Sequence, residues 1–218
     1  SVLLIRVPTR ASQRPRQRVL RELREGLAAI AGKPLLTQLM IAAIVGYVLM
    51  GPMQVLLPRL ATTQLGFGDM GRGVFLATLA VALMVGGLLA LKLSPSLPNG
   101  RAILFATIAA GGLLAWIGMS SRPGEAIAML FGVGVSGGLA LSLIVAGIQV
   151  NSEEQVRGRV LATYTVISQV VPAASGIAAG LLSELMGPQS ALILSGAVIA
   201  VATALNVVWM RALRSYVH

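Results

Sequence analysis

Residues 126–152 read AIAMLFGVGVSGGLALSLIVAGIQVNS and contain no Asp, Glu, Lys or Arg. A helix that crosses the roughly 30 Å hydrocarbon core of a bilayer needs about 20 predominantly apolar residues, so this run is long enough to span a membrane. Inside lipid, every backbone N–H and C=O group must be paired within the segment. The stretch therefore predicts a transmembrane α-helix.

Five further runs without a charged residue lie on either side of it. They occupy residues 34–58, 73–91, 102–121, 160–183 and 185–210. Several are separated by short segments rich in Pro, Gly and Ser, as expected for tight membrane loops. The sequence thus predicts an all-α polytopic membrane protein, with a six-helix transmembrane bundle over residues 34–218 and a cytoplasmic segment in residues 1–33.

The composition excludes most soluble classes and most catalytic chemistry. Only 11% of the 218 residues are charged, against about 25% in soluble domains. The chain has no cysteine and a single histidine, His218, which leaves no thiolate site, His-based triad or interior zinc site. We expect no enzyme, no metal and no cofactor.

The basic residues predict an orientation. Fourteen of the 17 Lys and Arg residues lie in the N-terminal segment, the loops after the second and fourth runs, and the C-terminus. The other side holds Arg59, Arg72 and Arg122. Because cytoplasmic loops are enriched in Lys and Arg, both termini are expected in the cytoplasm, at a bacterial inner membrane.

The first 33 residues contain two different elements. Residues 1–7 are too short to span a bilayer and look like the cut end of a preceding helix. Apolar residues then recur at helical spacing: Val19, Leu20, Leu23, Leu27 and Ile30. This pattern predicts a cytoplasmic amphipathic helix whose arginines meet anionic lipid headgroups. Nucleic acid is the alternative partner of such a basic run, but no aromatic residue is interleaved and a span follows directly, so we expect none.

A polar path through the bundle has to be built from neutral side chains, because the spans contain no ionisable group. Eight residues on the first, fourth and fifth spans are candidates for a substrate cavity: Tyr47, Gln54, Ser136, Ser142, Gln149, Tyr164, Ser168 and Gln169. Ser and Thr hydroxyls commonly bond their own helix instead, whereas a Gln amide is harder to bury unpaired. Pro52 and Pro172 are expected to kink their helices. A proton-coupling carboxylate would have to lie outside these spans.

The run GVGVSG at residues 132–137 matches a dinucleotide-binding pattern, but it lies in the middle of a span and not between a strand and a helix. The spacing of Gly134 and Gly138, and of Gly176 and Gly180, indicates close helix packing instead.

Several stretches carry a family resemblance: LREGL at 23–27, KPLL at 33–36, RGRV at 157–160, and a run comprising Gly176, GLL at 180–182, Leu185 and GP at 187–188. On these, the chain resembles the C-terminal six-helix half of a Major Facilitator Superfamily transporter. Within that superfamily it is most similar to the bacterial branch that includes the enterobactin exporter and related drug and siderophore exporters. Arg157, Gly158 and Arg159 match a cytoplasmic loop motif, whereas LPNGR at 97–101 keeps only Gly100 and Arg101 of the corresponding motif in the loop between the second and third spans.

The resemblance implies two inverted three-helix repeats around a central cavity, and efflux of an amphipathic small molecule by alternating access. It also implies contact with lipids and with a second bundle, either the N-terminal half of the same transporter or a second copy. The alternative function is a membrane scaffold, or a truncated half-protein, that packs against a partner bundle without transporting anything.

Overall fold

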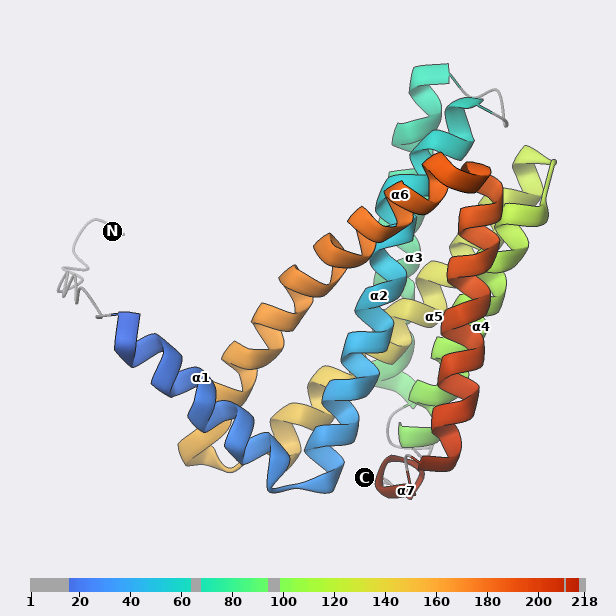
Figure 1. Cartoon of the computed structure of the whole chain (residues 1–218). Helices are drawn as coiled ribbons and strands as arrows, with labels where there is room; N and C mark the ends of the chain where they lie inside the picture. The colour runs from blue at the N-terminus through green and yellow to red at the C-terminus, as the bar shows by residue number, and fades with distance from the viewer. Residues whose placement is uncertain (1–15, 64–67, 94–98, 210, 216–218) are drawn as a thin grey trace, which may run out of the picture.

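The computed structural model describes residues 16–63, 68–93, 99–209 and 211–215, and the regular structure of these residues is entirely helical. The helices are α1 (Arg16–Ala31), α2 (Pro34–Thr63), α3 (Gly68–Leu93), α4 (Asn99–Met119), α5 (Pro123–Asn151), α6 (Glu154–Trp209) and α7 (Arg211–Arg214), as Figure 1 shows. The all-α prediction is confirmed. The expected end of a preceding helix at residues 1–7 lies outside the described residues.

Five of the described helices are long and apolar enough to cross a membrane. Four of them, α2 to α5, correspond to the first four predicted spans. The fifth is α6, which covers the fifth predicted span and the described part, 185–209, of the sixth. A straight helix of its 56 residues would be about 84 Å long, far more than one crossing needs.

The helix α6 is broken at Gly187, where φ is 83° and ψ is 158°. Residues with a Cβ atom rarely adopt such a conformation, so glycine allows the chain to turn back here. Figure 1 shows the result: a first arm (154–186, orange) rises along α2, and a second arm (188–209, red) descends beside α4. The sequence pattern placed the division at Glu184, which instead remains within the helix.

Small residues bring the helices together in pairs. In the α3–α5 pair, a methyl group added at Gly134 would lie 2.5 Å from the Ala82 side chain, and one at Gly138 would lie 2.4 Å from the Leu83 carbonyl oxygen. The packing interpretation of these glycines is confirmed. In the pair formed by α4 and the second arm, Gly111 and Gly196 approach each other in the same way.

The helix α1 docks against the start of α6. Gly26 is buried, with the Thr163 hydroxyl and the Arg159 carbonyl oxygen beside it, and Ile30 is buried as well. Leu27, which was expected on the same apolar stripe as Ile30, is 55% exposed. The face of α1 that contacts the bundle is therefore the one with Gly26 and Ile30, and Leu27 is left on the surface, where an apolar residue of an interfacial helix can meet lipid.

Candidate functional site

Two tyrosines join α2 to the first arm of α6. The hydroxyl groups of Tyr47 and Tyr164 lie 2.7 Å apart, and their ring centroids lie 5.8 Å apart with the ring planes tilted by 58°. Both side chains are only partly buried. The structure therefore brings together two of the predicted cavity residues from segments far apart in the sequence.

A groove of about 510 Å³, which we call the polar groove, begins at this tyrosine pair. Its lining comes from α2 and the first arm: Tyr47, Met50, Gln54, Ser168, Gln169, Pro172 and Ala173. Gln54 and Gln169 are exposed on the surface of the bundle. Five of the eight predicted cavity residues are thus at this groove, counting Tyr164 through its bond to Tyr47.

A close helix crossing supports the polar groove. A methyl group added at Gly51 would lie 2.1 Å from the Ser175 hydroxyl oxygen and 2.3 Å from the Gly176 backbone nitrogen. Only a residue without a side chain fits at this crossing. The prediction of a packing role for Gly176 is therefore confirmed, with Gly51 as its partner across the helix pair.

Both predicted kink prolines lie within helices and are buried: Pro52 in α2 and Pro172 in α6. Proline has no backbone N–H group, so the carbonyl of Ser168, four residues before Pro172, lacks its usual helical donor. The Ser168 hydroxyl donates to the Thr165 carbonyl at 2.8 Å.

The three candidates on α5 lie away from the polar groove. Ser136 and Ser142 are half-buried, and Gln149 is exposed. Ser142 lies against Gly87 of α3, consistent with the pairing of these two helices. Helical periodicity places Ser142 and Gln149, seven residues apart, on one stripe of α5, but it does not show which neighbour that stripe meets.

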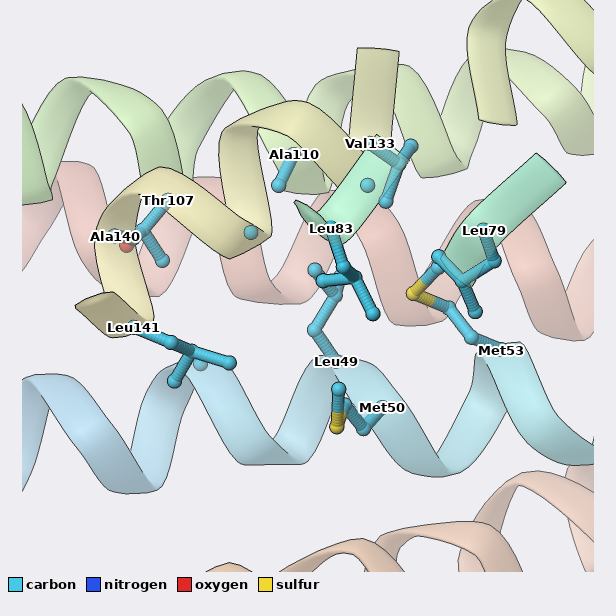
Figure 2. Close-up of a pocket in the computed structure, with 13 residues that line it drawn as sticks. Leu49, Met50, Met53, Leu79, Leu83, Thr107, Ala110, Val133, Ala140 and Leu141 are labelled. Atoms are coloured by element: carbon cyan, nitrogen blue, oxygen red, sulfur yellow. The ribbon is translucent and has the colours of Figure 1, made fainter. Parts of the chain in front are cut away.

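A second, apolar cavity lies inside the bundle, between α2, α3, α4 and α5. Figure 2 shows side chains from these helices converging on it, among them Leu49, Leu83 and Val133. Its volume of about 20 Å³ is only enough for about one water molecule. The Thr107 hydroxyl already donates to the Ile103 carbonyl at 2.8 Å. This cavity is a packing gap rather than a binding site.

The predicted cytoplasmic motif residues meet different partners. Gly100 packs against the Leu213 carbonyl of α7, while Arg101 is exposed at the start of α4. Arg157 donates to the Ser152 carbonyl at 3.4 Å, and Gly158 has open space around it. Arg159 forms an ion pair with Glu25 of α1 at 2.9 Å. Of the motif residues, Gly100 and Arg159 therefore join helix ends to neighbouring helices.

A second ion pair ties the start of α2 to the junction between α5 and α6. Lys33 Nζ lies 2.7 Å from Glu153 Oε1, and both side chains are substantially exposed. The hydrogen bond and the positive charge of Lys33 hold the pKa of Glu153 below its ordinary value. The sequence alone does not predict this pair, because the two segments meet only in the folded chain.

Among the described residues, no three His, Cys, Asp or Glu side chains are grouped so that they could hold a metal ion. Long apolar helices, small-residue packing and neutral polar groups on one face together define a polytopic membrane protein with a polar groove, and nothing in the groove resembles a catalytic site.

Comparison with known families identifies this class further. The family model of the Major Facilitator Superfamily matches residues 1–176, and the chain belongs to this superfamily of membrane transporters. A search of curated proteins and a search of solved structures gave no significant match. The match therefore confirms the predicted superfamily. The similarity to the branch of the enterobactin exporter remains a proposal.

Proposed function

We propose that this chain forms a six-helix half of a secondary active transporter, of the drug or siderophore export type, with the polar groove as its share of the substrate cavity. The observation that carries the proposal is the exposure of Gln54 and Gln169 on helices long enough to span a membrane. An amide that faces hydrocarbon without a partner is costly. The groove is therefore expected to face an aqueous cavity and not the lipid.

The packing pattern supports an arrangement of two inverted three-helix repeats, with α6 counted as two spans. In this arrangement α2 corresponds to α5, α3 to the first arm of α6, and α4 to the second arm. Exchanging the two triplets then turns the pair formed by α2 and the first arm into the pair formed by α5 and α3. Both pairs pack closely, and each has a glycine on both helices at the crossing: Gly51 with Gly176, and Gly86 with Gly138. Such a relation is typical of transporter repeats.

The chemistry of the polar groove favours an amphipathic, uncharged or weakly charged solute. Its lining offers two amides and the hydroxyls of Tyr47 and Ser168, next to the apolar surfaces of Met50 and Pro172. It contains no ionisable group that would bind a phosphate or carboxylate strongly. An aromatic or polyphenolic compound fits this mixture better than a sugar phosphate does.

Alternating access requires a second bundle against which this one can move. We infer that the N-terminal half of the same transporter, or a second copy of this chain, covers the groove face. The charge distribution supports cytoplasmic termini in a bacterial inner membrane. Lys33 lies between α1 and α2, Arg159 pairs with Glu25 of α1, and Arg101 follows Gly100, which packs against α7. Figure 1 shows α1 and α7 at the same end of the bundle. Tyr47 comes before the Gly51 crossing along α2, so the tyrosine pair lies on the side of the crossing that we infer to be cytoplasmic.

The experiment is transport of a panel of amphipathic dyes by the intact transporter in vesicles. The double variant Gln54→Leu/Gln169→Leu is expected to lower or redirect transport. The matched control Gln155→Leu changes an exposed glutamine at the start of α6, outside the polar groove, and is expected to transport like the wild type. Unchanged transport by the double variant, or an equal loss in the control, would show that the groove is not the substrate surface. A wild-type protein that transports no compound in the panel would favour the scaffold function.

A further inference from the structure

A groove distinct from the polar groove lies between α4 and the second arm of α6. We call it the α4–α6 groove. It has a volume of about 430 Å³ and is lined by Arg101, Leu104, Phe105, Ile108 and Val207. The four α4 residues are spaced i, i+3, i+4 and i+7, so they form one stripe along the helix, with the single charged residue at its end.

The surface around this groove is apolar. Phe105, which lines the groove, is 70% exposed. Leu205, Val201 and Val198 form an exposed apolar stripe on a different face of the second arm from Val207. In a protein that spans a membrane, a surface of this kind contacts lipid chains.

The two ends of α4 set the depth of the groove in the bilayer. At the end opposite Arg101, the indole Nε1 of Trp116 donates to Glu125 Oε1 at 2.8 Å, an arrangement typical of the membrane–water interface. Arg101 and Trp116 are 15 positions apart on the helix, a rise of about 22 Å. Since the hydrocarbon core is about 30 Å thick, the long Arg101 side chain covers the remaining distance to the headgroups by extending along the helix surface. Arg101 therefore lies at headgroup level, and Leu104 to Ile108 lead from it toward the membrane interior.

Arg101 has no carboxylate within ion-pair distance among the residues that the structure describes. Its guanidinium offers several hydrogen-bond donors in a geometry that suits a phosphate group. A positive group at the interface, directly above an apolar groove, matches the two parts of a phospholipid.

We propose that the α4–α6 groove binds an anionic phospholipid, with Arg101 on the phosphate and one acyl chain lying between Phe105, Ile108 and Val207. A glycerophospholipid with a net negative headgroup is favoured over a zwitterionic one, because no described carboxylate stands beside Arg101 to balance its charge. The site depends on the position of these helices in a membrane and not on the proposed transport, so it can fail or succeed independently.

The test is native mass spectrometry of the full chain released from detergent with equal amounts of phosphatidylglycerol and phosphatidylcholine. The wild type is expected to retain phosphatidylglycerol preferentially. Arg101→Gln is expected to reduce that retention about fivefold, the effect of one basic residue at an anionic surface. The matched control Lys92→Gln removes an exposed charge at the end of α3, outside the α4–α6 groove, and is expected to bind lipid like the wild type.

A second variant tests the acyl-chain part of the site. Ile108→Trp fills the groove without changing the charge, and it is expected to lose phosphatidylglycerol as Arg101→Gln does. Added glycerol phosphate, which has the headgroup chemistry without chains, is expected not to displace the lipid. Equal retention of the two lipids by the wild type, an equal loss in Lys92→Gln, full retention by Ile108→Trp, or displacement by glycerol phosphate would each overturn the proposal.

Discussion

The hydroxyl groups of Tyr47 and Tyr164 lie 2.7 Å apart, although the residues are separated by 117 positions in the sequence. This hydrogen bond joins the two helices that line the polar groove. Both tyrosines are partly buried. If one hydroxyl is removed, the other is left partly buried without its hydrogen-bond partner.

We predict that Tyr47→Phe and Tyr164→Phe each lower the free energy of unfolding by about 1 kcal/mol, the usual effect of breaking one such bond. The double variant is expected to lose no more than either single variant, since neither hydroxyl is then left unpaired. Denaturant unfolding of all four proteins in one detergent measures this. Strictly additive losses would mean that the two hydroxyls do not interact.

The crossing at Gly51 gives a second prediction. A methyl group there would lie 2.1 Å from the Ser175 hydroxyl oxygen and 2.3 Å from the Gly176 nitrogen, so Gly51→Ala has to push the two helices apart. We expect a loss of about 1–3 kcal/mol, typical of overpacking.

The control for this prediction is Gly112→Ala on α4, where no atom lies within 4 Å of the added methyl group. Because alanine favours a helix over glycine by about 0.5–1 kcal/mol, the control is expected to be slightly more stable than the wild type. A Gly51→Ala protein as stable as this control would contradict the close crossing.

The helices themselves could be predicted because membrane insertion depends on local composition. The uncharged runs that end near Pro58, Leu91 and Ser121 correspond to α2, α3 and α4, and a helix in lipid needs no distant residue to satisfy its backbone. The position of Tyr47 and Gln54 on one face of α2 could also be predicted, because the helical spacing alone determines it.

Contacts between helices could not be predicted in this way. The Lys33–Glu153 and Glu25–Arg159 ion pairs depend on how α1 and α2 lie beside the start of α6. Helical spacing predicts the amphipathic helix but not that Gly26 would dock against Thr163 of α6. The break in α6 was placed at the charged residue Glu184, whereas the backbone geometry of Gly187 decides it.

The break at Gly187 gives a third prediction. Its φ of 83° is in the region that residues with a side chain rarely adopt, although no atom lies within 4 Å of an added methyl group. Gly187→Ala should therefore destabilise the protein through backbone strain alone, by about 1–3 kcal/mol. Gly158→Ala also has open space around it, without the positive φ. Thermal unfolding should separate the two variants, and equal melting temperatures would contradict the strained turn.

The ion pair between Lys33 and Glu153 predicts a pH dependence. The contact lowers the pKa of Glu153, so the folded state binds a proton at this site less readily than the unfolded state does. The resulting stabilisation is present at neutral pH, above the ordinary pKa of Glu, and is lost as the pH falls through the lowered pKa of the folded protein. Since both side chains are exposed, the effect on overall stability is expected to be small.

A direct measurement is the carboxyl NMR titration of Glu153 in detergent-solubilised protein. Lys33→Gln removes both the hydrogen bond and the positive charge, so the midpoint for Glu153 is expected to rise toward the ordinary glutamate value. Lys92→Gln removes an exposed lysine that has no such contact among the described residues, and it is expected to leave the midpoint in place. A midpoint that is the same in the wild type and in Lys33→Gln would mean that the ion pair does not persist in solution, and that α2 and the α5–α6 junction are held together only by their packing.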